Sequence, residues 1–292
     1  LALQLLPQLP EAAGGGAAAH WSGGGTERPV LRKERQKPVT ELMEYFSFLW
    51  ELLKRDLKKK YYKSVLGVVW TLLNPVLMML VMTVIFSTLF RRSVEYYPAY
   101  YLCAYVLLNF NNTATAQALG CIPANGNLLR KIHLPSYLFC LATVGVNGFT
   151  LLLSIIPLLG VCLLVGVPVS WYWLLIPAPL LYTVIFTTGL SLLLAAVGVF
   201  FRDMAYLYGI VTTVWMYLTP MFYPVTIIPR PYRFLWELNP MFHYTEILRN
   251  LVLYQTMPSE RSLLIAGAYS LLTLAAGIHV FRSCQDRFYV HL

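Results

Sequence analysis

Apolar residues occur in six long runs along the chain, and short polar segments separate the runs. They cover about residues 65–89, 99–121, 136–166, 172–200, 204–222 and 262–281. A helix needs about 20 consecutive apolar residues to cross a bilayer. The pattern therefore predicts an all-α membrane protein with six transmembrane helices.

The segment before the first run has a different period. Its apolar side chains recur at helical spacing, at Leu42, Tyr45, Phe46, Leu49, Leu52 and Leu53, and its charged side chains occupy the other face, at Glu41, Glu44, Glu51, Arg55 and Lys58. This pattern predicts an amphipathic helix that lies in the membrane surface. We expect Thr40 to cap its N-terminus and Glu51 to pair with Arg55 one turn later.

The segment between the last two runs, residues 223–261, is too long for a turn and too apolar for a free loop. Pro231 suits a helix start, Asn239-Pro240 breaks a helix, and residues 241–255 resume helical spacing. Irregular backbone at membrane depth requires cover from protein or a water-filled cavity. We therefore predict two short re-entrant helices between spans five and six, on the outer side.

Composition and charge support this interpretation. The 292 residues are 58% hydrophobic and only 12% charged, whereas soluble domains carry about 25% charged residues. With an even number of spans both termini share a side, and 16 of the 22 Lys and Arg residues then fall there. Cytoplasmic segments are the ones enriched in Lys and Arg, so both termini are expected in the cytoplasm. Six of these cations lie just before the first span, at Lys54, Arg55, Lys58, Lys59, Lys60 and Lys63. At this position they are expected to lie at the level of the lipid headgroups and anchor the chain there, so they do not indicate nucleic-acid binding.

Candidate chemistry is sparse. No acid lies in the middle of a predicted span, and no GxxxxGK[ST] motif for ATP occurs. The five cysteines form no CxxC pair, so neither a zinc site nor a disulfide framework is expected. No cofactor is expected in this chain, and any energy for work must come from a partner. Residues 1–30, rich in Gly and Ala, are interpreted as a disordered leader, and residues 31–64 as a cytoplasmic segment before a membrane domain at 65–292.

The inner loop "IPANGNLLRKIHLPS" contains a turn at Asn125-Gly126, a possible cap at Asn127 and a stop at Pro135. Leu128, Leu129 and Ile132 share one side of the short helix between them. Two interpretations stay open: an ordinary inner turn, and a helix seated in another subunit.

Four blocks resemble the membrane subunits of type-2 ABC exporters that move polysaccharides. They are "RDLKKKYYKSVLGVVWTLLNP", the inner loop above, "FFRDMAY" and "LTPMFYPVTIIPRPYRFLWELNPMFHYTEILRN", in the family's order over residues 40 to about 285. The first block is closer to the O-antigen exporters than to the teichoic-acid exporters.

The resemblance implies roles for particular residues. It implies an interface helix at 41–55. The interface residues that it implies, in the first of the four blocks, are Arg55, Asp56, Lys58, Lys60 and Tyr61. It implies an ATPase-coupling helix at 126–134, with Asn127, Leu128, Leu129, Arg130, Lys131, Ile132 and His133. It also implies outer gate helices at 231–256 and a substrate path, for which the candidates are Trp70, Tyr217, Phe222, Tyr223, Phe234, Trp236, Asn239, Pro240 and Phe242.

The resemblance further implies a homodimer in the bacterial inner membrane, two copies of a separate ATPase that holds ATP and Mg²⁺, and a lipid-linked polysaccharide substrate. Other substrates stay open, namely teichoic acid, capsule, a glycolipid or a drug. A membrane-embedded glycan-modifying enzyme and a structural scaffold are the alternatives from other classes. Co-purification with an ATPase would separate a transporter from both.

Overall fold

The computed structural model describes residues 38–62, 67–90, 94–131, 135–201 and 203–291, and in these residues it contains helices and no strand. Val39–Leu292 form one compact unit. The predicted all-α class is confirmed. The predicted leader, Lys63, Ile132 and His133 lie outside the described residues.

The predicted spans correspond to long helices. Four segments are long and apolar enough to cross a membrane: Val69–Phe86 in α2 (Val69–Phe90), Tyr137–Val165 as α5, Trp171–Phe200, which joins η1 (Trp171–Leu175) to α6 (Pro177–Phe200), and Glu260–Phe288 in α10 (Glu260–His291). Helix α3 (Tyr97–Ala124) is long but more polar, and α7 (Met204–Leu218) is apolar but has only 15 residues. The structure thus supports four of the six predicted spans by length and composition alone.

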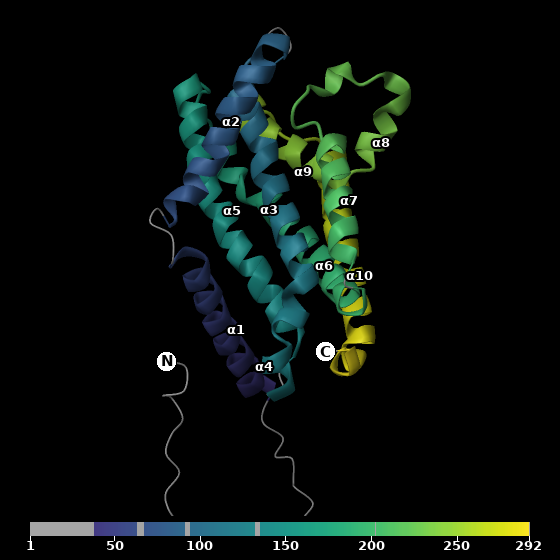
Figure 1. Ribbon diagram of the computed structural model, residues 1–292. Coiled ribbons are helices and arrows are strands. Elements are labelled where there is room, and N and C mark those ends of the chain that lie inside the picture. Colours follow the sequence, from purple (N-terminus) through teal and green to yellow (C-terminus); the bar gives the residue numbers. More distant parts are fainter. Residues whose placement is uncertain (1–37, 63–66, 91–93, 132–134, 202, 292) are drawn as a thin grey trace, which may run out of the picture. The chain divides into compact units, whose positions relative to one another are not determined.

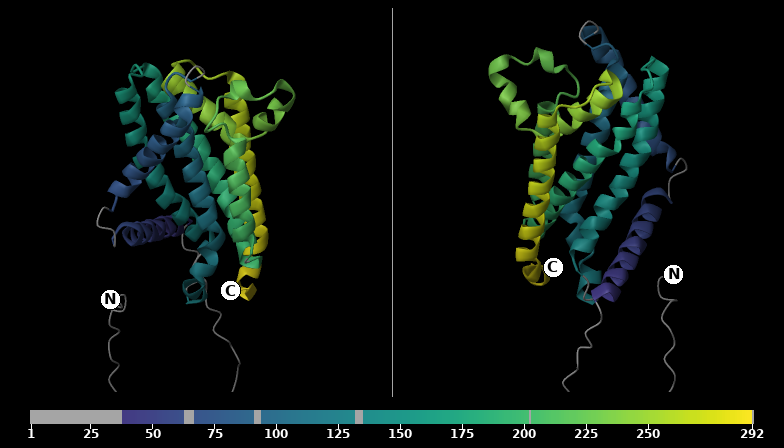
Figure 2. Two further views of the ribbon diagram at one scale, coloured as in Figure 1. Left: turned by 45° about the horizontal axis from the view of Figure 1, so that its top comes forward. Right: turned by 180° about the vertical axis from the view of Figure 1, so that it is seen from behind.

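Helix α3 lies at the centre of the helix bundle (Figures 1 and 2). It packs against α5 on one side and α6 on the other, α10 packs along α6, and α2 lies over α3 and α5. Glycines allow α6 and α10 to approach closely: a Cβ on Gly277 would overlap the carbonyl of Gly189, and one on Gly189 would overlap the backbone of Leu274. Small residues at a helix crossing bring two backbones into contact, which is how membrane helices commonly gain packing.

Helix α1 (Pro38–Tyr61) confirms the helix predicted before the first span, but it is longer than the expected 41–55. It begins before Thr40, so Thr40 is not its cap, and it continues through the lysines because Leu, Lys and Arg favour helix and no Gly or Pro interrupts them. The predicted pair is also wrong, since Glu51 pairs with Lys54 at 2.8 Å and Arg55 pairs with Asp56 at 2.8 Å.

One face of α1 packs on one end of the long helices. Leu52 is buried in a core that includes Phe139 of α5 and Phe281 of α10. Phe46, predicted on this face, is 70% exposed, and Phe48 packs against the core in its place. Helix α4 (Gly126–Lys131) lies at the same end as α1 (Figure 1).

Residues 223–261, predicted to lie on the outer side, form several short helices. This segment contains η2 (Val225–Ile227), η3 (Arg230–Tyr232), α8 (Arg233–Glu237), α9 (Pro240–Arg249) and a π-helical turn, η4 (Asn250–Tyr254). The break at Asn239-Pro240 is confirmed. The two halves differ, because α9 is mostly buried while α8 leaves Phe234 and Leu235 exposed.

Candidate functional site

A cavity of about 920 Å³ opens at the end of the bundle where α1 meets the C-terminus of α3, the end predicted to face the cytoplasm. Its lining includes Arg55, Asp56, Lys59 and Lys60 of α1, facing the last two turns of α3. Three cations and one acid give this mouth a positive field, which attracts anionic groups such as phosphates.

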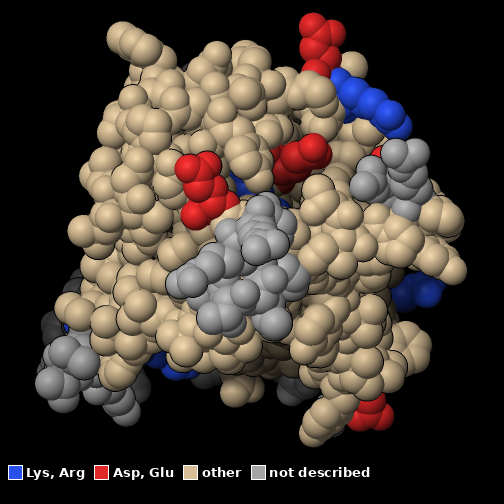
Figure 3. Space-filling view, turned by 90° about the horizontal axis from the view of Figure 1, so that it is seen from above, with Lys and Arg blue, Asp and Glu red and all other residues tan. Residues whose placement is uncertain are grey.

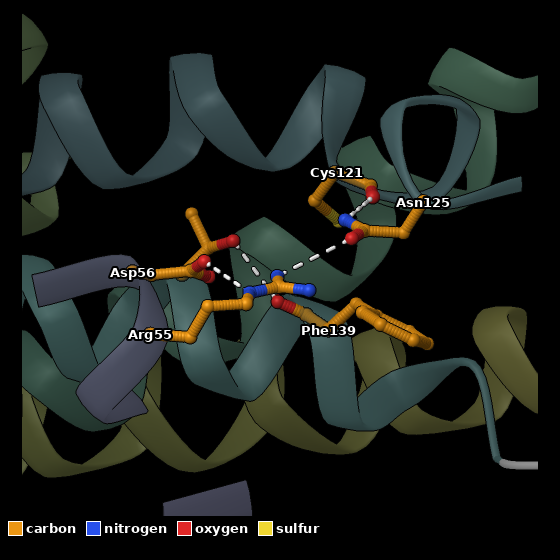
Figure 4. A network of polar contacts seen from close by, with 6 residues as sticks. Arg55, Asp56, Cys121, Asn125 and Phe139 are labelled. Carbon is orange, nitrogen blue, oxygen red and sulfur yellow. Dashed lines mark hydrogen bonds and ion pairs between the residues drawn. The ribbon is translucent and has the colours of Figure 1, made fainter. Parts of the chain in front are cut away.

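A hydrogen-bond network holds α1 against the end of α3 (Figure 4). Arg55 Nε donates to Asp56 Oδ1, and Arg55 Nη2 reaches Asn125 Oδ1 at 3.3 Å. Asn125 in turn donates from Nδ2 to the carbonyl of Cys121 at 2.8 Å, which closes the C-terminus of α3. The network fixes the Arg55 guanidinium at the rim of the cavity.

The five predicted interface residues lie close together but face different neighbours. Arg55, Asp56 and Lys60 line the inner cavity, and Lys58 Nζ lies 5.5 Å from the centre of the Tyr62 ring. Lys60 Nζ donates to Thr150 Oγ1 of α5 at 2.8 Å. Desolvation against α5 lowers the pKa of Lys60 from its ordinary value, and the neighbouring Tyr61 partly offsets this effect.

Helix α4 differs from the prediction in the direction its leucines face. Leu129 is only 2% exposed and belongs to the same core as Leu52, so it is not free to enter another subunit. Leu128 is partly buried against that core. The helix begins at Gly126, where Asn125 O accepts the backbone N–H groups of Leu128 and Leu129, so Asn127 is not the cap. Asn127 is the exposed residue of α4 whose side chain is described.

Asn239 connects the outer segment to the end of α7. Its Oδ1 accepts from the backbone N–H of Met241 at 3.0 Å, which caps α9, and from Trp215 Nε1 at 2.6 Å. Its Nδ2 donates to Thr219 Oγ1 at 2.8 Å. One amide side chain that is 6% exposed therefore fixes both the start of α9 and the chain reversal after α7.

The predicted gate residues divide into groups. Tyr217, Phe222, Tyr223 and Trp236 are brought together: Tyr223 donates to Tyr217 O at 2.6 Å, and Trp236 Nε1 donates to Tyr223 Oη at 2.9 Å. The ring centres of Tyr217 and Phe222 are 6.0 Å apart. Phe242 is buried in α9, and Phe234 is 56% exposed on α8. Trp70 lies apart from them, in a second cavity with Tyr61.

Arg249 is a site residue that the sequence reasoning missed. It is 4% exposed, and it donates from Nη2 to Pro220 O at 2.8 Å and from Nε and Nη2 to Tyr100 O at 3.3 and 3.2 Å. Its guanidinium carbon lies 3.4 Å from the centre of the Tyr100 ring. Within the described residues it has no carboxylate partner. The signal was present in the sequence, since Arg249 is a lone cation in an apolar stretch.

Two tyrosines of α3 support the same junction. Tyr100 Oη donates to Tyr223 O at 3.0 Å, and Tyr97 Oη donates to Phe222 O at 3.0 Å. Both are 3% exposed. Together with Arg249 they hold the backbone from Pro220 to Tyr223 against the central helix. On this end, which Figure 3 views from above, charged side chains are few and most of the surface is uncharged.

Comparison with known proteins agrees with this architecture. The family model for the ABC-2 type transporter matches residues 47–253. The O-antigen export system permease protein RfbA of Myxococcus xanthus is 28% identical over 252 residues, which covers 86% of this chain and 97% of that protein. RfbA of Klebsiella pneumoniae is 26% identical over 246 residues, or 83% and 94% of the two chains. The capsule polysaccharide export inner-membrane protein CtrC of Neisseria meningitidis is 25% identical over 209 residues, or 68% and 76%.

The family match spans α1 through η4 and so includes the inner mouth, Asn239 and Arg249. Members of this family are membrane transport subunits that carry no catalytic domain. Since the match covers well over half of its 292 residues, the chain belongs to the ABC-2 type transporter family.

Proposed function

We propose that this chain is the permease of an ATP-driven exporter that moves a lipid-linked polysaccharide of the O-antigen type outward across the bacterial inner membrane. The observation that carries the proposal is the similarity to two O-antigen permeases, which extends over at least 83% of this chain and 94% of each relative. The cationic inner mouth supports it, because a lipid-linked glycan presents phosphate at the membrane surface.

In this proposal all six predicted segments cross the membrane, including the polar α3 and the short α7, with both termini in the cytoplasm. The polar groups of α3 support a buried central position. Thr187 Oγ1 donates to Asn111 Oδ1 at 3.0 Å, and Tyr208 Oη donates to Thr115 Oγ1 at 2.7 Å. Polar side chains at membrane depth are stable when neighbouring helices satisfy them in this way.

The transport path would form between two copies of the chain. Along α7 the only buried side chain is that of Tyr208, and the residues that α7 leaves exposed include Tyr206, Leu207, Ile210, Val211, Val214 and Tyr217. Helix α2 likewise exposes apolar residues along its length. Such faces need cover by lipid or protein, and a second copy that meets them would enclose a canal.

Energy would come from a separate ATPase, two copies of which would bind at the inner end and hold ATP and Mg²⁺. The exposed part of α4, at Asn127, and the charged face of α1 are the described surfaces that a cytoplasmic partner could reach. Export of capsule is the second candidate function, because CtrC is similar over 68% of the chain.

Deletion of the gene with complementation tests the proposal. A deletion strain should lose its surface polysaccharide and accumulate lipid-linked glycan in the inner leaflet, and the plasmid-borne gene should restore export. Normal surface polysaccharide in the deletion strain would refute the proposal. Retention of O-antigen with loss of capsule would favour the second candidate.

A further inference from the structure

A second cavity, of about 420 Å³, lies between α2, α3 and α5, and we call it the wedge. The lining residues from these three helices that carry a polar group are Trp70, Thr71, Asn74, Asn109, Thr113, Asn147, Thr150 and Ser154. Asn109 and Thr113 are near the middle of α3, and Asn147 and Thr150 are near the middle of α5. The wedge thus brings polar side chains together with apolar neighbours such as Val106 and Leu151, among helices that are proposed to cross the membrane.

Asn147, which lines the wedge, has unused hydrogen-bonding capacity in its amide. Asn147 is 2% exposed; its Nδ2 donates to Gln117 Oε1 at 2.8 Å and to Thr143 O at 2.9 Å. Its Oδ1 is buried and has no partner. A buried polar atom left without a partner costs about 1–3 kcal/mol. This atom is itself covered, so a ligand in the wedge would reach it only if neighbouring side chains moved.

Other groups around the wedge are also available. Within the described part of the chain, the side chains of Asn74, Asn109 and Thr113 make no hydrogen bond. An amide offers both donors and acceptors, and a hydroxyl offers both as well. Ionisable and polar groups at membrane depth are costly and usually functional. The lining therefore suits a ligand that carries several donors and acceptors in a small volume.

Charge and aromatic rings narrow the class of ligand. Lys60 is the only charged residue among the described residues that line the wedge, so a cationic ligand would find no counter-ion there. Trp70 lies at the wedge with its side chain 49% exposed, and Tyr61 Oη lies 3.2 Å from Thr71 Oγ1. A sugar ring stacks its C–H face on an aromatic ring and pairs its hydroxyls with amides.

We infer that the wedge is a binding subsite for one sugar unit of the exported glycan, with Lys60 favouring a sugar that bears an anionic group. The amide of Asn109 and the hydroxyl of Thr113 bind the sugar hydroxyls, and Trp70 covers a ring face. This inference rests on the proposed export function and adds a place within one protomer where the substrate is held.

Saturation-transfer difference NMR on the full-length protein in lipid nanodiscs tests the inference. The probes are methyl α-glucoside, glucose 1-phosphate and inorganic phosphate, each added alone. The wild-type protein should transfer saturation to both sugars, and glucose 1-phosphate should bind more tightly than methyl α-glucoside. The inference would be overturned if neither sugar received saturation, or if inorganic phosphate bound and neither sugar did.

Matched variants locate the binding. Asn109→Leu and Thr113→Val break no hydrogen bond within the described residues, and each should weaken sugar binding about fivefold, the equivalent of one lost hydrogen bond. Asn112→Leu is the control, because Asn112 lies on the same helix and does not line the wedge. Equal binding by all three variants would overturn the inference.

Export measured in the complemented deletion strain separates this inference from the proposed function. Asn109→Leu should reduce surface polysaccharide, whereas Asn112→Leu should not. If Asn109→Leu abolishes sugar binding but export is normal, the wedge is not on the path and only this inference fails. If the wedge binds sugars as expected but deletion leaves the surface polysaccharide intact, the proposed export function fails.

Discussion

Arg249→Lys tests whether the buried guanidinium holds the outer segment in place. Lysine keeps the positive charge, so the cost of removing that charge from water is unchanged to a first approximation. The variant loses geometry, because Arg249 reaches both Pro220 O and Tyr100 O while its guanidinium carbon lies 3.4 Å from the Tyr100 ring centre. The ammonium group of lysine, on a flexible side chain, cannot bind both carbonyl oxygens and at the same time contact the Tyr100 ring as the guanidinium does.

The size of the effect follows from these contacts. Loss of the bond to Tyr100 O removes one charge-assisted hydrogen bond, worth about 1.5–3 kcal/mol. Loss of the planar stack over a buried ring adds about 0.5–1 kcal/mol. The expected destabilisation is therefore about 2–4 kcal/mol. For the 292-residue chain, at about 2 °C per kcal/mol, that corresponds to a fall in Tm of about 4–8 °C.

The assay is thermal unfolding of the purified protein in detergent, followed by tryptophan fluorescence at one scan rate. Arg261→Lys is the matched control: Arg261 lies 3.6 Å from Glu237, and its side chain is 79% exposed. Exposed ion pairs of this kind contribute about 0.2–1 kcal/mol, so the control should change the Tm little. If Arg249→Lys melts within about 1 °C of the control, the contacts of Arg249 with Pro220 and Tyr100 do not stabilise the fold and the reasoning is wrong.

Three further predictions concern packing and the inner surface. Leu129→Asp should lower the yield of folded protein, because an unpaired carboxylate in the core costs several kcal/mol, whereas Asn127→Asp should fold normally and weaken ATPase co-purification; the reverse pattern would contradict the orientation of α4. Gly277→Ala should cost about 1–3 kcal/mol by forcing α6 and α10 apart, while Gly160→Ala, with open space around its Cβ, should leave the Tm nearly unchanged; equal Tm values would refute close packing at Gly277. Asn239→Leu should cost about 1–2 kcal/mol through loss of the α9 cap, and an unaltered Tm would show that the amide does not hold this junction.

Elements whose cause is local could be predicted from the sequence. Apolar runs of sufficient length predicted the long helices, and Asn239-Pro240 predicted the break, because proline fixes its φ and disfavours helix in the residue before it. The helix before the first span was predicted from the spacing of its apolar residues, but its end at Tyr61 was not. The lysines after residue 55 were interpreted as a membrane anchor outside the helix, whereas lysine is a good helix former and the helix continues through them.

Features that depend on distant partners could not be predicted. Whether Leu129 faces inward depends on how α1 lies below α3, and a helix of six residues has too few positions to show a face. Arg249 binds the carbonyl of Tyr100, which is 149 residues away, and no local pattern indicates that contact. The wedge joins amides from three helices, so it becomes visible only when the helices are packed.

The central claim is that this chain, with an ATPase, moves a lipid-linked polysaccharide across the membrane. The most direct measurement uses inside-out vesicles that contain the chain and its ATPase partner, loaded with radiolabelled lipid-linked glycan in the outer leaflet. Glycan that has crossed is protected from an added glycosidase. We predict that protection grows with ATP and does not grow with a non-hydrolysable analogue. Glycan that stays fully accessible while the assembled complex hydrolyses ATP would contradict the account.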